Sequence, residues 1–375
     1  MTVWRAPGMP TLLAAAGLGF VGFAVLLPVA PMWAIHIGAD SLGAGLVNMV
    51  LMACTVIAQL LVGRVLRRVS WPMTLSVGLL LLGAPALVHG YADTLWLVLV
   101  LAALRGLGFG ILTVCGVDGI AGLVAPEHRG RAIGAYGLVL AAPQFILIPL
   151  APWLSEHVGF GPVFASAGAP LLAIPLVLLW AKAVPRPPEP TGEHLSLVRG
   201  LVKPVATLVA VTAAGGALIT FAPEFTSAET AFAVLLGLTG TAALSRWRVG
   251  ALADRHGPRR FLAPMLATGA VGLGLVAAGI GGHHSVIVVG AVLVGVAYGG
   301  LQSLTLMAAF AAAGEHARSI VSVAWNVGFD TGTGLGALGV GAIATASSFP
   351  VAFSAVAAVC AMVALWWCRP RATRG

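Results

Sequence analysis

The sequence predicts an all-α polytopic membrane protein, with twelve transmembrane helices arranged as two six-helix pseudo-repeat halves. Three observations predict it: the apolar composition, the spacing of the apolar runs, and a one-sided distribution of Lys and Arg. Of the 375 residues, 59% are hydrophobic and only 9% are charged. A soluble domain carries about 25% charged residues, so this chain has too few charges to cover a surface that faces water.

The apolar runs recur along the whole chain at lengths that suit membrane helices. A transmembrane helix needs about 20 mostly apolar residues. The first run is too long for the apolar region of a cleavable signal peptide, so we expect it to be a membrane span. The expected spans are residues 11–35, 42–62, 73–90, 95–121, 131–151, 162–182, 204–223, 230–245, 261–281, 285–309, 319–344 and 349–367.

Basic residues fix the expected orientation. Of the 20 Lys and Arg residues, all but Arg105 fall on one side of these spans, and the other side carries only acidic residues and histidines. Because Lys and Arg are retained on the cytoplasmic side, we expect a multi-pass protein of the plasma (inner) membrane with both termini in the cytoplasm. Topology thus accounts for the net charge of +8, and we expect no nucleic-acid partner.

A polar stretch divides the chain near its midpoint. Residues 185–203 are proline-rich at their start, which favours an extended and semi-rigid segment there. The expected organisation is an N-terminal half over residues 1–183, a cytoplasmic linker over 184–203 and a C-terminal half over 204–375.

The two halves repeat each other. Gly63 opens a basic segment after the second span, and Gly250 opens another 187 residues later, after the eighth. A Glu-His pair precedes the fifth span and another precedes the eleventh, 188 residues further on. Parallel six-helix halves with both termini on one side are a repeat arrangement found in secondary transporters.

The segment after the eighth span is the sharpest motif, with the sequence Gly-Ala-Leu-Ala-Asp-Arg-His-Gly-Pro-Arg-Arg. Its first glycine permits close helix contact, its second permits a tight turn, and its Asp can cap a helix N-terminus. The segment resembles the loop between the second and third helix of each half in the major facilitator superfamily, Gly-x-x-x-Asp-Arg-x-Gly-x-Arg-Arg. The resemblance covers the whole chain and implies that this loop is a conformational latch on the cytoplasmic side. The latch residues are Gly250, Asp254, Arg255, Gly257, Arg259 and Arg260.

The first-half copy of the latch departs from the pattern. Gly63 is present, but Arg67 stands where the Asp is expected, and Arg68 follows it. An Arg cannot cap a helix N-terminus, because the helix dipole repels it. The family often carries an acid near the end of the fourth helix, where Gly122 stands here, and Asp118 lies one turn earlier. We expect Asp118 to pair with Arg67, Arg68 or Arg64 in place of the missing acid; the alternative is a proton or substrate role for Asp118.

Two segments carry a finer resemblance. Residues 103–150 and 321–343 resemble the bacterial drug- and metabolite-efflux branch of the superfamily, whose members are proton antiporters. The proline-glycine signature of antiporters in the fifth helix is reduced to Gly134, Gly137 and Pro143. The resemblance therefore implies efflux without naming a substrate.

Polar groups inside the spans are the candidates for substrate and proton binding, because a charge exposed to lipid costs a few kcal/mol. Arg105 lies near the middle of the fourth span, and Asp330 near the middle of the eleventh. We expect a central polar cavity in which Arg105 attracts an anionic or hydrogen-bond-accepting group and Asp330 carries a proton or contacts a cation. The alternative is a pairing of Asp330 with Arg105 or with Asn326 that only holds helices together. The candidate residues are Arg105, Asp330, Asn326, Tyr298, Gln302 and Gln144.

Other classes of function find little support. The sequence contains no phosphate-binding loop, nucleophile triad or metal-ligand set, so we expect no enzyme activity, no cofactor and no metal. We expect a monomeric, proton-coupled exporter of small organic molecules whose two halves rock around a midplane cavity. The alternatives are an importer of a sugar or metabolite with the same fold, and a solute sensor that does not transport. The expected partners are a small-molecule substrate, protons and the lipid bilayer.

Overall fold

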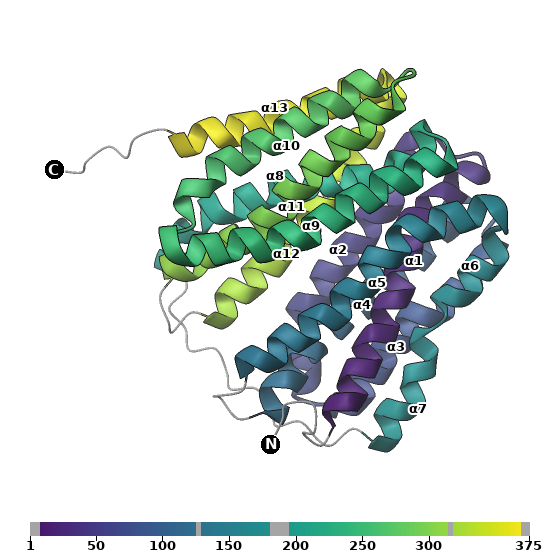
Figure 1. Cartoon of the computed structure of the whole chain (residues 1–375). Helices are drawn as coiled ribbons and strands as arrows, with labels where there is room; N and C mark the ends of the chain where they lie inside the picture. Colours follow the sequence, from purple (N-terminus) through teal and green to yellow (C-terminus); the bar gives the residue numbers. More distant parts are fainter. Residues whose placement is uncertain (1–7, 125–128, 181–194, 314–317, 369–375) are drawn as a thin grey trace. The chain divides into compact units, whose positions relative to one another are not determined.

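The computed structural model describes residues 8–124, 129–180, 195–313 and 318–368, and every regular element in these ranges is a helix (Figure 1). The chain divides into two compact units, unit 1 over Met1–Pro190 and unit 2 over Thr191–Gly375. Unit 1 contains α1 (Met9–His36), α2 (Ser41–Leu66), α3 (Trp71–Leu87), the short 3-10 helix η2 (His89–Tyr91), α4 (Leu95–Leu123), α5 (Arg129–His157), α6 (Phe160–Ala167) and α7 (Pro170–Trp180). Unit 2 contains α8 (Leu195–Phe225), α9 (Ala228–His256), α10 (Arg259–Gly279), α11 (His284–Ala313), α12 (Arg318–Ala346) and α13 (Phe349–Cys368).

The expected spans correspond to these helices, and the prediction of an all-α polytopic membrane protein is confirmed. Ten stretches among the described residues are long and apolar enough to cross a membrane. Helix α3 has 17 residues and is shorter than these ten stretches. Helix α12 lies outside the ten because side chains such as Asn326 and Asp330 make it more polar. The sixth span is divided into α6 and α7 at Gly168 and Pro170, since proline has no N–H to continue the helix.

The same helix pairs pack together in both units. In unit 1, α2 and α3 pack on α4, α1 packs on α5, and α3 packs on α7; in unit 2, α9 and α10 pack on α11, α8 on α12, and α10 on α13. One hydrogen bond is repeated with the same spacing of 51 residues: Thr55 Oγ1 donates to Gly106 O at 3.1 Å, and Thr241 Oγ1 donates to Val292 O at 3.0 Å. The repeat read from the sequence is therefore a repeat of packing within each unit.

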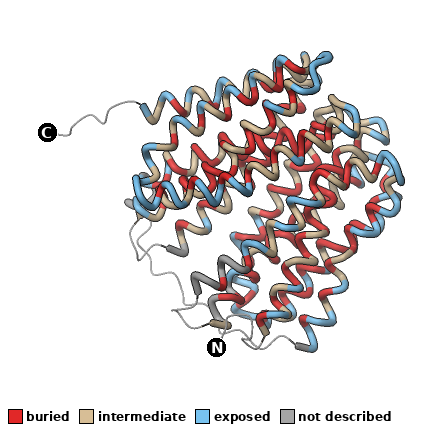
Figure 2. Tube along the Cα trace, in the orientation of Figure 1, coloured by how far each residue is buried: buried red, intermediate tan, exposed pale blue. Residues whose placement is uncertain are grey.

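Small residues let these helices approach closely. A Cβ atom added at Gly108 of α4 would lie 2.5 Å from Gly78 O of α3. Gly328, Gly332 and Gly336 form a glycine strip along α12 that lies against α8. A Cβ at Gly328 would lie 2.9 Å from Val205 Cγ1. Such contacts suit membrane helices, which associate through close packing because lipid offers no hydrophobic driving force. Buried positions accordingly line the packed faces of the helices in each unit (Figure 2).

The latch of the second half is mostly helical, so the expectation that it forms a loop is wrong. Helix α9 continues to His256 and includes Gly250, Asp254 and Arg255. Only Gly257 and Pro258 separate α9 from α10, and Gly257 has the positive φ of 80° that the expected tight turn requires. Hydropathy marks where a chain leaves the apolar layer, but a helix of Ala, Leu and Arg continues beyond that point.

The central polar stretch is only partly described. Helix α8 begins at Leu195, so residues 195–203 of the expected linker are helical. Residues 181–194, which include the rest of the linker, lie outside the described residues. In the first half, α2 includes Gly63 and ends at Leu66, and Arg67 follows as its C-cap.

Candidate functional site

The latch side chains of unit 2 lie at the surface. Asp254, Arg255, Arg259 and Arg260 are all exposed. Helix α10 takes Pro258 as its N-cap and has no side-chain cap bond, so the capping of that helix by Asp254 is not observed. The site of Gly250 leaves room for a side chain, since an added Cβ would meet only Ser303, at 3.7 Å.

Arg105 is the buried cation of unit 1. It has no exposed surface, and its Nη2 donates to Gly22 O of α1 at 3.4 Å. Its neighbour Gly106 fixes α4 against α2, because a Cβ there would collide with the backbone of Leu51. Among the described residues, Nε and Nη1 of Arg105 have no hydrogen-bond partner. The guanidinium thus keeps two donors that an acceptor group could use.

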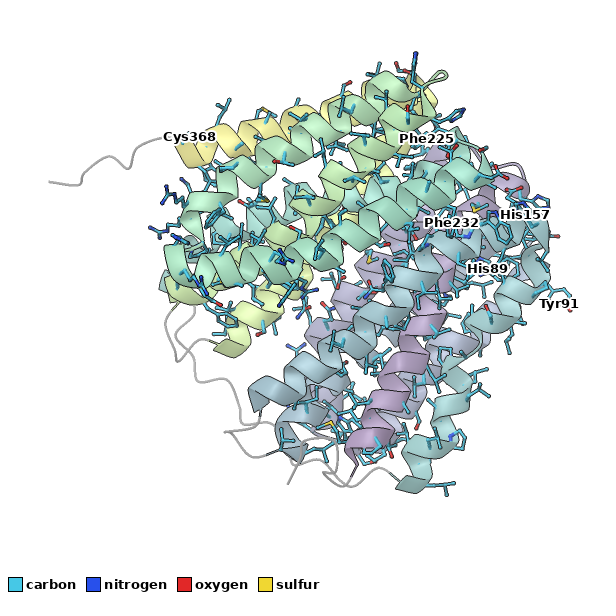
Figure 3. The ribbon with its side chains drawn as sticks, in the orientation of Figure 1. His89, Tyr91, His157, Phe225, Phe232 and Cys368 are labelled. Atoms are coloured by element: carbon cyan, nitrogen blue, oxygen red, sulfur yellow. The ribbon has the colours of Figure 1, made fainter. Side chains whose placement is uncertain are left out.

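A buried histidine accompanies Arg105. His89 lies in η2, between α3 and α4, at the same end of unit 1 as Tyr91 and His157 (Figure 3). Its ring is fully buried, lies 5.2 Å from the ring of Phe164, and interacts electrostatically with Arg105. Neither ring nitrogen has a hydrogen-bond partner in the described part of the chain. Nothing in the sequence distinguishes His89 from the other histidines near the ends of spans.

Unit 2 brings several candidate residues onto two adjacent helices. Asp330 of α12 is 5% exposed, and Gln302 of α11 is 6% exposed. Tyr298, one turn before Gln302, interacts electrostatically with Asp330. Trp325 Nε1 donates to Thr305 Oγ1 at 3.2 Å, which connects α12 to α11 beside these residues.

Arg246 is a site residue that the sequence reasoning missed. The expected eighth span ended at residue 245, which assigned Arg246 to a cytoplasmic loop, but the residue lies inside α9. Its Nη1 donates to Gln302 Oε1 at 3.1 Å, and its carbonyl accepts a bond from Ser303 Oγ at 3.0 Å. Arg246 also interacts electrostatically with Tyr298. The available signal was its position one helical turn before Gly250, within a segment of strong helix formers.

Two other candidates bond within their own helices, and the side chain of a third is not described. Gln144 Nε2 donates to Leu140 O at 3.0 Å, and Asn326 Nδ2 donates to Ser322 O at 2.9 Å, so each amide bonds to its own helix. Asp118 lies in α4, but its side chain is outside the described ones, and its pairing with the arginines after α2 stays a prediction. In the described ranges, no three His, Cys, Asp or Glu side chains gather as a metal site.

Comparisons with known proteins agree with this architecture. The family model of the Major Facilitator Superfamily matches residues 12–245. A solved bacterial homologue of the human lysosomal transporter Spinster, inward-facing and unoccupied, is similar with a TM-score of 0.79 and 16% identity, over 96% of this chain and 95% of that one. An auto-inhibited POT family peptide transporter is similar with a TM-score of 0.78 and 14% identity, over 98% of both chains.

The nucleoside transporter NupG is also similar, with a TM-score of 0.73 and 11% identity over 96% of this chain and 98% of its own. At these identities the solved structures show a shared fold alone. A comparison with curated proteins gives no match.

Proposed function

The chain belongs to the Major Facilitator Superfamily, whose members are secondary membrane carriers and not enzymes, and from that premise we propose that it exports small organic molecules in exchange for protons. The observation that carries the proposal is Asp330, a carboxyl group only 5% exposed near the middle of the long helix α12. A charge in such a place is costly and generally marks an ion or substrate pathway.

Asp330 is the proposed proton carrier. Binding a proton removes a buried negative charge, so protonation changes the free energy of every arrangement that leaves Asp330 covered. Tyr298 supports the assignment, because its hydroxyl is close enough to interact electrostatically with Asp330. Proton binding at Asp330 thereby biases the packing of α12 on its neighbours in unit 2.

Arg105 is the proposed substrate contact of unit 1. Its Nε and Nη1 donors have no partner in the described part of the chain, and its burial removes competition from bulk water. A hydrogen bond to a charged donor is roughly twice as strong as one between neutral groups. Gln144 and Asn326 remain weaker candidates, because their amides bond to their own helices.

The transport cycle in this proposal is alternating access. The two units rock against each other around a binding site near the membrane midplane, as in other carriers built from repeats. The protein is proposed to be a monomer in the inner membrane. Both termini are proposed to lie in the cytoplasm, because nearly all of the Lys and Arg residues lie on that side of the spans.

Proton movement across proteoliposomes tests the proposal. The purified protein is reconstituted with a pH-sensitive dye inside the vesicles and is given hydrophobic cations, anions and neutral metabolites in turn. Substrate-dependent proton movement is expected for the wild type, and Asp330→Asn should abolish it. Asp93→Asn is the matched control, because Asp93 is an exposed acid between η2 and α4. Tracer flux of an active compound without proton movement, or proton movement that survives Asp330→Asn, refutes the assignment.

A further inference from the structure

Arg246 is held differently from an ordinary cytoplasmic arginine. An arginine that only sets topology projects into water and needs no protein partner. The guanidinium of Arg246 instead donates to Gln302, a side chain that is only 6% exposed, while its backbone carbonyl accepts from Ser303. Arg246 and Arg248 are both exposed, but Arg248, two residues later, lies over the ring of Trp247 at 5.0 Å. Arg246 is therefore directed toward α11 and Arg248 is not.

Helices α9 and α11 run side by side in fixed register. Thr230 Oγ1 and His284 Nδ1 are 3.3 Å apart where the two helices start. Ser245 Oγ donates to Val296 O at 2.7 Å further along. Because the helices are parallel and aligned, positions equally far from their starts lie at the same depth.

This register gives the depth of each group. Arg246 and Gln302 both lie 18 residues after the starts of their helices, which is about 27 Å along the helix axis. Tyr298 lies 14 residues after the start of α11, or about 21 Å along it. Helix α12 runs the opposite way, so on the same scale Asp330 is counted back from Ala346 and lies 16 residues, or about 24 Å, from that end. Asp330 therefore lies within about 3 Å of the depth of Arg246, Gln302 and Tyr298, toward the cytoplasmic side of an apolar layer about 30 Å thick.

Hydrogen-bond donors gather around Arg246. Gln302 Oε1 accepts from Arg246, which leaves the Gln302 amide N–H groups as donors. The Tyr298 hydroxyl is a further donor, and it interacts electrostatically with Arg246. In the described part of unit 2, the Arg246 side chain thus meets neutral groups, Gln302 and Tyr298, that can share one acceptor with it. Arg, amide and hydroxyl donors together favour a planar or tetrahedral anion.

We propose that Arg246, Gln302 and Tyr298 form an anion-binding subsite on the cytoplasmic side of unit 2, which holds a carboxylate or phosphate group of the transported compound. The inference rests on the proposed transport function and deepens it by naming the substrate class. A compound that enters from the cytoplasm meets this subsite at nearly the depth of Asp330 on the neighbouring helix α12. Arg246 then selects anionic substrates, and Asp330 binds the coupled proton at a similar depth.

A matched set of probes tests the substrate class. The full-length protein is placed in nanodiscs of phosphatidylcholine, and the binding of 2-naphthoate, 2-naphthamide and 2-naphthylmethylammonium is compared by calorimetry. Naphthoate is expected to bind about tenfold or more tightly than the amide, because one charge-assisted contact distinguishes them. Arg246→Gln should remove that preference, and Gln302→Leu should reduce it. Arg248→Gln, the control on the same helix, should leave it unchanged.

The outcomes separate the possible sources of the anion. The proposed subsite is wrong if the protein shows no preference for naphthoate over naphthamide that depends on Arg246. A phosphate group could also come from an anionic lipid, so the measurement is repeated with phosphatidylglycerol in the nanodiscs. If phosphatidylglycerol raises the melting temperature through Arg246 while naphthoate does not bind, the site belongs to lipid and the substrate class is wrong.

The transport assay distinguishes failure of the subsite from failure of the function. If the protein transports a neutral compound in exchange for protons, and Arg246→Gln does not change that transport, the anion subsite is wrong and the proposed export function stands. Arg246-dependent naphthoate binding without proton movement for any compound would keep the subsite and overturn the exporter.

Discussion

The close contact between α10 and α11 allows a quantitative prediction about stability. A Cβ atom at Gly272 of α10 would lie 2.7 Å from Gly290 O, and one at Gly290 of α11 would lie 2.6 Å from Gly272 O. Ordinary contacts begin at 3.4 Å, so Gly272→Ala requires the two backbones to separate by about 0.7 Å. Gly274, two residues later on the same helix, has no atom within 4 Å of its added Cβ.

The two alanine substitutions therefore differ in sign. Each substitution stabilises its helix by about 0.5–1 kcal/mol, because alanine has a higher helix propensity than glycine. Overpacking costs about 1–3 kcal/mol, and it applies only at Gly272. With an overpacking cost of about 2 kcal/mol, Gly272→Ala should thus lower the free energy of unfolding by about 1–1.5 kcal/mol, while Gly274→Ala should raise it by up to about 1 kcal/mol. For a unit of this size we expect melting temperatures about 4–8 °C apart.

Thiol exposure on heating measures this difference. Cys115 and Cys360 are buried, so a thiol-reactive dye reports their release, and Cys54→Ser with Cys368→Ser removes the half-buried and the exposed thiol. The two glycine substitutions are made in that background. If Gly272→Ala melts at or above the temperature of Gly274→Ala, the α10–α11 contact is not as close as the backbone geometry indicates.

Two further predictions concern the ends of the units. Trp367 Nε1 donates to Thr207 Oγ1 at 2.8 Å, and Lys203 Nζ lies 4.8 Å and 5.3 Å from the rings of Trp366 and Trp367, so Trp367→Phe should cost about 1–2 kcal/mol. Trp247→Phe, at an indole that is 67% exposed, is the control and should change stability by less than about 0.5 kcal/mol in the same thermal assay. His89→Phe should leave stability unchanged or raise it, because the buried ring nitrogens of His89 have no hydrogen bond among the described residues and a phenyl ring can stack on Phe164. A fall of more than a few degrees in the melting temperature of His89→Phe would mean that the imidazole has a polar partner.

Much of the fold could be predicted because its signal is local. Each apolar run reports its own transfer into lipid, so the spans and the all-α class follow from short windows of sequence. The glycine strip at Gly328, Gly332 and Gly336 is predictable for the same reason, since glycines four residues apart share one helix face. Helix ends were less accurate: the break between α6 and α7 and the extension of α9 to His256 depend on hydrogen bonds that hydropathy does not record.

The candidate site was predicted in part. Asp330 and Arg105 were identifiable because a charge inside an apolar run is conspicuous whatever surrounds it. Arg246 was not, because it stands just past an apolar run, where topology alone explains an arginine. Its bond to Gln302 joins residues 56 positions apart and depends on the alignment of α9 with α11.

The sequence by itself determined that the chain crosses a membrane many times, repeats itself, and buries at least one acid and one base, since hydropathy and internal similarity are properties of the residues in order. The tertiary structure decided which polar groups meet. It gave Arg246 a buried amide partner, directed Asn326 and Gln144 to their own helices, and left Arg105 beside Gly22 with donors that have no partner among the described residues. Those pairings are set by which helix faces pack together, and packing joins residues whose separation along the chain carries no signal.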